Sequence, residues 1–454
     1  MRERYHIEVV QNDQLIAFCP PSLLKEQQLK RMAFGSLSME IEFLPHPDKQ
    51  DRIVLSREIQ KGLKFPDSQQ ALHAFIENET LYIGPLVGIF TAGFMDDPAN
   101  PIGERTEFFK KLLSVNKTVG ALPFLFGDHD INWEQGTIDG YFYQQHSWHR
   151  QEVPFPNVIY DRLPNRKIER SPRLIKIKQR LQKEYLIPWF NPGFFNKLDI
   201  YDRLQQDDSV AGYLPETHPF TSFSLIETML AKYGHVYIKP KNGSLGLGVH
   251  QILYDKHSTD YFCRYQDQEG MNRLRKFPSL ELLFKWVFPN QTLENMLVQQ
   301  GIHLLRINRR PVDFRIHTNK DDLGSWHVSA IAAKVAGHGS VTTHKRSGGE
   351  VKTLNEIFTK EEAELYTKKL SDAALQLSKV LEQNVEGIIG EIGFDLGIDR
   401  HGDVWLFEAN SKPGRSIFSH PKLKPFDFET HKLSLAFSIF LTEQALLHPE
   451  ELYK

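Results

Sequence analysis

The chain has 454 residues, of which 40% are hydrophobic and 25% charged, with a formal net charge of −2 at pH 7. We expect two or three folded domains, because this length exceeds what one core usually serves and the composition is not that of a disordered chain. The near-neutral charge excludes a whole-molecule field for nucleic acid or an anionic membrane surface, and two cysteines exclude a disulfide framework.

No stretch approaches the roughly 18 to 20 apolar residues that span a bilayer, and the N-terminus lacks the apolar core of a signal peptide. We therefore expect a soluble intracellular protein without a membrane span. Residues 1–110 contain short apolar segments separated by Pro, Gly and Asp, which predicts a β-rich N-terminal module. Within it, residues 80–94 read as a buried strand and a loop. The spacing of Gly84, Gly88 and Gly93 does not match a dinucleotide-binding loop.

Helical and strand-like patterns alternate from about residue 104, which predicts parallel strands joined by crossover helices in a small α/β domain over 111–190. A third domain is expected over 191–454. Its first part has a turn at 191–193, a short strand at 194–195 and a helix, with Lys197 at the junction between strand and helix.

A glycine-rich loop over 242–248 follows a strand that carries Lys239. Glycines allow backbone N–H groups to turn toward a phosphate, and the lysine supplies a positive charge. No Gly-Lys-Ser/Thr opens a helix after it, so the loop differs from a P-loop and fits a hairpin over phosphates better. A glycine-rich turn without any ligand is an equally good interpretation of this loop alone.

Further on, residues 296–302 and 312–318 are predicted strands, and the second places Asp313, Arg315 and His317 on one face. A glycine-rich loop at 337–351 carries His344, Lys345 and Arg346.

The segment 387–414 reads as two apolar strands joined by a tight turn at His401 and Gly402. Counting outward from that turn places Asp395 opposite Glu408 and Asn410 opposite Gly393, which leaves room for a bound atom. Such an oxygen cluster is typical of a Mg²⁺ site. An ordinary hairpin with a wet polar face explains the segment equally well by itself. Lys412 and Arg415, just beyond, are either ligands for an anionic acceptor or surface residues.

The order of these features resembles the ATP-grasp superfamily over roughly 190–454, most specifically in the letters EANSKPG at 408–414. The resemblance implies a mixed α/β and α+β fold, with a β-rich module at 1–110, a pre-ATP-grasp domain at 111–190 and an ATP-grasp domain at 191–454. It also implies ATP and Mg²⁺ as cofactors. The implied roles are phosphate binding by Lys197, Lys239, Gly243, Ser244, Gly246 and Gly248, adenine binding near Gln299, Gln300 and Ile302, metal binding by Asp395, Glu408 and Asn410, and catalysis by Arg315, Arg346 and Lys239.

The whole chain also resembles the YheC/YheD group of endospore coat-associated proteins, through NKLDIYDRL, KPKNGSLGLG, VDFRIH and GFDLGID with WLFEANSKPG. This resemblance implies synthesis in the mother cell, association with the spore coat and contact with other coat proteins. Two functions remain open. One is an ATP-dependent ligase that joins an unknown carboxylate to an amine through an acyl phosphate. The other is a non-catalytic coat protein that has kept the fold. A nucleic-acid binder lacks the necessary basic surface.

Overall fold

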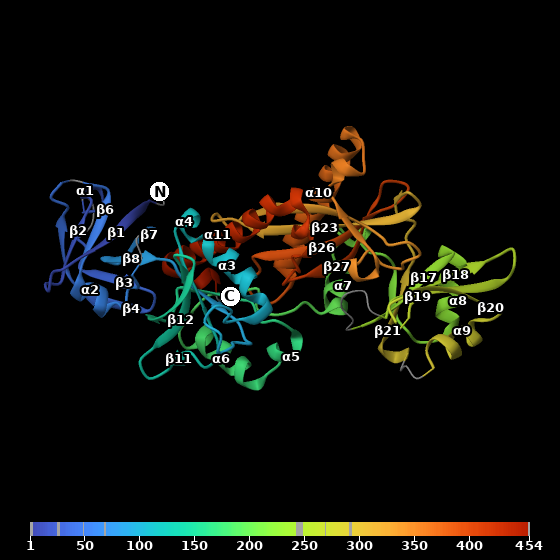
Figure 1. Cartoon of the computed structure of the whole chain (residues 1–454), viewed down its shortest axis with the longest axis horizontal. Helices are drawn as coiled ribbons and strands as arrows, with labels where there is room; N and C mark the ends of the chain where they lie inside the picture. Colours follow the sequence, from blue (N-terminus) through green and yellow to red (C-terminus); the bar gives the residue numbers. More distant parts are fainter. Residues whose placement is uncertain are drawn as a thin grey trace.

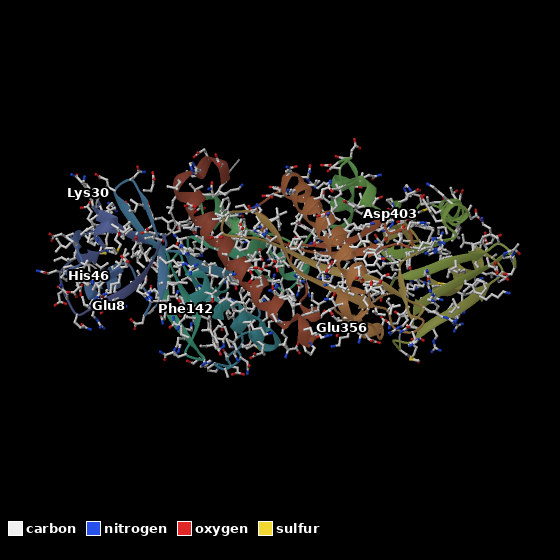
Figure 2. The ribbon with its side chains drawn as sticks, turned by 90° about the horizontal axis from the view of Figure 1, so that it is seen from above. Glu8, Lys30, His46, Phe142, Glu356 and Asp403 are labelled. Carbon is white, nitrogen blue, oxygen red and sulfur yellow. The ribbon has the colours of Figure 1, made fainter. Side chains whose placement is uncertain are left out.

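The structure is a computed structural model that describes residues 3–24, 28–48, 50–67, 70–241, 248–267, 269–289 and 293–452, with only the backbone given for Arg346. Four sheets follow one another along an elongated molecule, from the N-terminal module at one end to a small lobe at the other (Figure 1). In the perpendicular view, Glu8, Lys30 and His46 mark the N-terminal end, and Asp403 lies toward the opposite end (Figure 2).

The first sheet has eight strands in the order β4-β3-β8-β7-β1-β6-β2-β5, and it forms the β-rich module that the sequence predicts. Two short helices, α1 (Pro21–Leu24) and α2 (Arg57–Gly62), connect its strands. The strands are β1 (Arg4–Val10), β2 (Ile16–Cys19), β3 (Arg31–Phe34), β4 (Leu37–Glu40), β5 (Glu42–Pro45), β6 (Arg52–Ser56), β7 (Ala71–Glu77) and β8 (Thr80–Gly84).

The second sheet has seven strands, and four of them, β9, β10, β14 and β15, pair in parallel as the alternating pattern predicts. Its strands are β9 (Leu86–Phe90), β10 (Leu122–Phe126), β11 (Ile131–Asn132), β12 (Thr137–Gln144), β13 (Ser147–Pro154), β14 (Val158–Asp161) and β15 (Trp189–Phe190). Its helices are α3 (Thr106–Ser114), α4 (Asn116–Val119), α5 (Arg166–Glu169) and α6 (Pro172–Lys183).

Two local predictions near this sheet are wrong. Residues 86–90, which the sequence reads as part of the first module, form β9 at the centre of the second sheet, because a fully buried strand needs cover on both faces. Residues 194–195 are not a strand. The strand there is β15, five residues earlier, and it forms because Trp189 and Phe190 pair with β14. The division of the chain into three domains stays a prediction.

The third sheet forms the small lobe, with two helices, α8 (Phe223–Tyr233) and α9 (Leu280–Val287), packed in its core. Its strand order is β16-β21-β17-β18-β19-β20. The strands are β16 (Thr217–Pro219), β17 (His235–Pro240), β18 (His250–Asp255), β19 (Asp260–Gln266), β20 (Asn272–Phe277) and β21 (Met296–Gln300).

The fourth sheet forms the large lobe and carries the predicted metal hairpin. Its strands are β22 (Arg306–Ile307), β23 (Arg310–Lys320), β24 (Trp326–Val335), β25 (Glu350–Lys352), β26 (Glu391–Ile398) and β27 (Val404–Asn410). Helices α7 (Lys197–Gln205) and α10 (Lys360–Asn384) pack on it, and α10 begins at a capping box between Thr359 and Glu362. Helix α11 (Lys424–Leu447) lies between this sheet and the second one, and α12 (Pro449–Leu452) follows it.

The hairpin between β26 and β27 has the predicted register at its functional end. Asp395 pairs with Glu408, and Gly393 pairs with Asn410. The predicted two-residue turn is wrong, because Ile398 pairs with Val404 and five residues form the loop. A register shift between Asp395 and Leu396 compensates, since a bulge adds one residue to β27.

No helix among the described residues is long and apolar enough to cross a membrane.

Candidate functional site

A cavity lies between the small and large lobes, and it brings together residues from segments far apart in sequence. Of the predicted site residues, seven line it: Lys197, Lys239, Gln299, Gln300, Ile302, Asp395 and Glu408. The other lining residues are Tyr237, Pro240, Val249, Leu304, Pro311, Asp313, Lys334, Val341, Thr342, Thr343, His344 and Phe407. The lining therefore combines charged side chains with apolar ones.

Lys239 lines this cavity from β17. Its Nζ donates a hydrogen bond to Oε1 of Gln299 at 2.9 Å, and Nε2 of Gln299 donates to Oγ1 of Thr217 at 2.9 Å. Burial, together with the positive charge of Lys197, lowers the pKa of Lys239 to about 8, against a smaller opposing effect of Glu408. Within the described residues, a neutral amide is the only group that bonds to this ammonium, so a phosphate would be a stronger partner.

Lys197 is the first residue of α7, whose N-cap Asn196 accepts hydrogen bonds from the N–H groups of Leu198 and Asp199. The cap fixes the start of the helix, and Nζ of Lys197 lies 3.4 Å from Oε1 of Glu408 on β27. The two residues predicted to bind phosphate and metal are thus adjacent in the structure.

Asp395 is held by two cations at the centre of the cavity wall. Arg315 donates from Nε and Nη2 to its two oxygens at 3.0 and 2.9 Å, and Nζ of Lys334 donates to Oδ1 at 2.7 Å. Burial alone would raise the pKa of Asp395, but the charges of Arg315 and Lys334 outweigh it and hold that pKa below its usual value. Asp395 is therefore ionised near neutral pH.

Lys334 and Thr343 take part in this cluster, although the sequence did not single them out. Nζ of Lys334 also lies 3.0 Å from Oδ1 of Asp313, and Oγ1 of Thr343 donates to Oδ2 of Asp313 at 2.6 Å. The period-two pattern of β24 could have indicated Lys334, because a lysine inside an otherwise apolar strand needs a buried partner. Thr343 and His344 bring the glycine-rich loop to the cavity.

The apolar part of the lining includes Ile302, Leu304, Pro311 and Phe407. Two backbone N–H groups just before Ile302 are already hydrogen-bonded within the protein. The N–H of Gln300 donates to Glu216 O at 2.8 Å, and that of Gly301 donates to His235 O at 3.0 Å. The side chain of Gln300 accepts from the N–H of Glu216 at 3.0 Å. An aromatic base could insert here between aliphatic and aromatic side chains.

Several predicted residues cannot be placed in the cavity. Gly243, Ser244 and Gly246 lie outside the described residues, as does the side chain of Arg346. Gly248 is described and has φ +72°, a conformation that favours glycine, at the entry to β18. Arg315 lies behind Asp395, and Asn410 lies further along the hairpin; neither lines the cavity.

The space over Gly393 is not free for a bound atom, contrary to the sequence expectation. A Cβ at this position would approach Cβ of Pro413 to 2.4 Å and Nη1 of Arg315 to 3.5 Å. Glycine is needed here because the chain that leaves β27 folds back over β26. The oxygen donors of the hairpin therefore face a site limited by Pro413 on one side.

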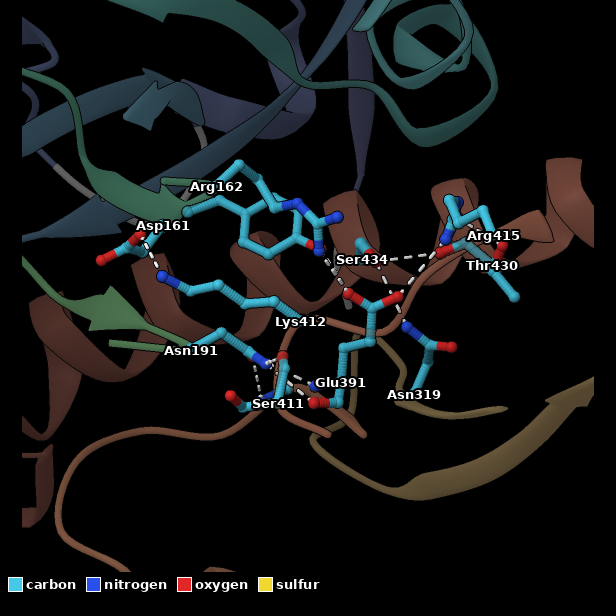
Figure 3. Close-up of polar contacts among 12 residues, drawn as sticks. Asp161, Arg162, Asn191, Asn319, Glu391, Ser411, Lys412, Arg415, Thr430 and Ser434 are labelled. Atoms are coloured by element: carbon cyan, nitrogen blue, oxygen red, sulfur yellow. Dashed lines mark hydrogen bonds and ion pairs between the residues drawn. The ribbon is translucent and has the colours of Figure 1, made fainter. Parts of the chain in front are cut away.

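Lys412 and Arg415 are not surface residues, because both are largely buried against carboxylates of this chain (Figure 3). Binding of an anionic acceptor by either residue stays a prediction. Nζ of Lys412 lies 2.6 Å from Oδ1 of Asp161, with side chains only 3% and 1% exposed. Nη1 of Arg415 lies 3.3 Å from Oε1 of Glu391. Both residues connect the hairpin to other parts of the fold.

The donor set of the hairpin fits a divalent cation. Two carboxylates on directly paired residues, together with the amide oxygen of Asn410 on the same face, are hard oxygen ligands of the kind that Mg²⁺ prefers. Nearby cations at Lys197, Lys239 and Lys334 would attract the phosphates of a nucleotide. In the ligand-free chain, Lys197 pairs with Glu408 and Lys334 pairs with Asp395 instead, whereas Lys239 contacts the amide of Gln299.

The comparisons with known proteins agree with the arrangement of these elements. A family model described as "YheC/D like ATP-grasp" matches residues 186–441. The chain is 43% identical over 443 residues to the endospore coat-associated protein YheD of Bacillus subtilis (strain 168), covering 95% of both chains. It is 24% identical over 272 residues to the endospore coat-associated protein YheC of the same organism, covering 59% of this chain and 74% of that protein.

Among solved structures, the VanG D-Ala:D-Ser ligase of Enterococcus faecalis aligns with a TM-score of 0.45 and 11% identity, covering 79% of this chain and 99% of that chain.

Proposed function

The chain belongs to the YheC/D-like ATP-grasp family, and we propose that it is an ATP- and Mg²⁺-dependent ligase that joins a carboxylate to an amine. The observation that carries the proposal is the cavity between the lobes. It unites three lysines, three carboxylates and several apolar side chains within one space. A purely structural protein has no need to collect these groups, since charges at a buried site cost solvation free energy.

In the proposed reaction, a carboxylate oxygen of the substrate attacks the γ-phosphorus of ATP, and the bond to ADP breaks. The amine nitrogen then attacks the acyl carbon of the acyl phosphate, and phosphate and a proton leave as the amide forms. Mg²⁺ held by Asp395, Glu408 and Asn410 would supply positive charge to the phosphate oxygens.

The chain's own groups bind and orient the reactants. Lys197 and Lys239 would bind phosphate oxygens, and Ile302 with its apolar neighbours would hold the adenine. Arg315 and Lys334 hold Asp395 in the ligand-free chain. When bound phosphates attract these two cations, Arg315 would stabilise negative charge on the transferred phosphoryl group. Arg346 and Lys345 would close the loop at 337–351 and exclude water, which would otherwise hydrolyse the acyl phosphate.

We also propose that the protein associates with the endospore coat after synthesis in the mother cell, where other coat proteins are its partners. The support is that the two relatives reported above are named as endospore coat-associated proteins. For the two substrates, the proposal names only their chemical classes, a carboxylate and an amine.

A thermal shift measurement tests the nucleotide site. Mg-ATP at about a hundred times its dissociation constant should stabilise the wild type by about 2.7 kcal/mol. The Glu408→Gln variant should lose most of this stabilisation. The matched control is Glu429→Gln, which removes a carboxylate that pairs with Lys432 at 3.2 Å outside the cavity. Equal behaviour of wild type and Glu408→Gln would contradict nucleotide binding at this site.

Trapping with hydroxylamine tests the chemistry. With Mg-ATP and pools of amino acids, peptides and cell-wall fragments, an acyl phosphate would be converted to a hydroxamate, and ADP would appear in equal amount. Without hydroxylamine, the same pools should yield an amide and phosphate. Binding of Mg-ATP with neither hydroxamate nor phosphate release would assign the chain to the second function, a non-catalytic coat component.

A further inference from the structure

Asn191 stands at the point where the second sheet meets the metal hairpin. It follows directly after β15, has φ +51° and is fully buried. Its own N–H donates to Ile388 O at 2.8 Å, beside a parallel bridge between Phe190 and Ile388. Positive φ is uncommon for residues other than glycine, although asparagine tolerates it better than most. The sequence indicates only a turn here.

The side chain of Asn191 uses both of its polar atoms on the backbone of the hairpin (Figure 3). Oδ1 accepts from the N–H groups of Gly390 and Glu391 at 2.9 and 3.1 Å. Nδ2 donates to Glu391 O at 2.7 Å and to Ser411 O at 2.5 Å. One carboxamide therefore holds the start of β26 and the end of β27 together.

These contacts lie close to the predicted metal ligands in the chain. Glu391 is four residues before Asp395, and Ser411 directly follows Asn410. Ser411 is fixed further, because its Oγ donates to Gly193 O at 2.6 Å and accepts from the N–H of Phe195 at 3.2 Å. The segment around Asn191 thus fixes the base of the hairpin from both sides.

The hairpin is also tied to the second sheet by charge. Asp161 at the end of β14 pairs with Lys412, and Arg162 lies 3.1 Å from Oε2 of Glu391. The small lobe makes none of these contacts at the base of the hairpin. A shift of that lobe around a nucleotide would therefore leave the hairpin in place relative to the second sheet.

We propose that Asn191 is a positioning residue, which sets the spacing between Asp395 on β26 and Asn410 on β27 and so determines the Mg²⁺ affinity of the nucleotide site. The effect of Asn191 on Mg²⁺ affinity rests on the proposed function. Its role in holding the two strands of the hairpin does not. Asn191 is not a catalytic residue, because it lies outside the cavity and acts through the backbone of the hairpin.

The test uses Asn191→Gly, which removes the carboxamide while keeping a residue that tolerates φ +51°. The matched control is Asn308→Gly, because Asn308 also has positive φ, +50°, and lies in the exposed turn between β22 and β23. The affinity of each full-length protein for ATP is measured by calorimetry over a range of Mg²⁺ concentrations, and again in EDTA.

In Asn191→Gly, the Mg²⁺ concentration that half-saturates ATP binding should rise about 10- to 100-fold, the usual effect of removing a group that orients metal ligands. ATP affinity in EDTA should stay within about twofold of wild type, and Asn308→Gly should match wild type in both measurements. A general loss of stability in Asn191→Gly would instead weaken ATP binding to the same extent with Mg²⁺ and in EDTA. An unchanged Mg²⁺ dependence in Asn191→Gly, with wild type binding Mg-ATP normally, would overturn the proposal.

Amide hydrogen exchange in the ligand-free protein separates this inference from the proposed function. The N–H groups of Gly390 and Glu391 should exchange faster in Asn191→Gly, while the amides of β24 keep their wild-type rates. If wild type does not bind Mg-ATP, the proposed function fails, and exchange alone then decides whether Asn191 holds the hairpin. Unchanged exchange at these two amides would refute it.

Discussion

Two carboxylates on β26, Glu391 and Asp395, point from the same face of the sheet and are each held by two cations. Glu391 contacts Arg162 and Arg415, and it also accepts a hydrogen bond from the hydroxyl of Tyr160 at 2.6 Å. Asp395 contacts Arg315 and Lys334. The chemistry of the two clusters is therefore alike.

Their surroundings differ. Glu391 is 0% exposed, and its partners Arg162 and Arg415, 11% and 12% exposed, come from the second sheet and from the segment before α11, so the carboxylate of this cluster is sealed. Asp395 lines the cavity, so solvent or a ligand can reach it. A sealed cluster can only stabilise the arrangement of its segments, whereas an open cluster can exchange its internal partners for a nucleotide and a metal ion.

The largest expected effect comes from the sealed cluster. Glu391→Gln leaves Arg162 and Arg415 buried with one countercharge fewer, which should cost about 3–5 kcal/mol of unfolding free energy. Urea denaturation measures this loss. Glu386→Gln, the same change at an exposed position five residues earlier, should stay within about 0.5 kcal/mol of wild type. A loss below about 1 kcal/mol for Glu391→Gln would mean that water reaches this cluster. It would contradict the distinction between a sealed cluster at Glu391 and an open one at Asp395.

Asp395→Asn should show the opposite balance. Water in the cavity can solvate Arg315 and Lys334, so the loss of unfolding free energy should stay below that of Glu391→Gln. Mg-ATP affinity should fall at least about 100-fold, because a proposed metal ligand is lost. Parallel denaturation and calorimetry of the two variants would sharpen the comparison. Equal stability losses with normal Mg-ATP binding in Asp395→Asn would contradict it.

The smallest expected effect is a pH dependence of the open site alone. The pKa of Lys239 is lowered to about 8, so its charge is present below that pH and is lost as the pH rises through it. ATP affinity should therefore weaken by about tenfold between pH 7 and pH 9. Lys239→Arg, which stays charged over this range, should remove the dependence. A wild-type affinity that is flat up to pH 9 would show that Lys239 does not bind the phosphates.

The hairpin shows how far local patterns reach. Apolar runs at 392–398 and 404–409 predicted two strands, and counting outward from the turn predicted the pairing of Asp395 with Glu408; the structure confirms both. The turn was predicted one residue out of register, and a bulge on β27 restores the pairing. Alternation predicts which side chains share a face of the sheet. It does not predict a bulge, because the position of a bulge depends on packing across the sheet.

The cavity was predicted only in part for a similar reason. Glycine-rich loops, a junction lysine and an acidic hairpin are visible in the chain, and seven of the residues named from them line the cavity. Lys334 was missed because nothing in β24 indicates that Asp313 and Asp395 lie on neighbouring strands beside it. The surface alternative for Lys412 was wrong because its partner Asp161 is 251 residues away.

The sequence by itself determined the family, the fold class and the side chains that could serve a nucleotide and a metal ion. Periodicity, glycine content and motif order are properties of the sequence, and they can be recognised without knowledge of the fold. Only the tertiary structure decided which charges are open to ligands and which are sealed. The same residue types form both clusters, and burial by distant segments, here the second sheet and α11, makes the difference.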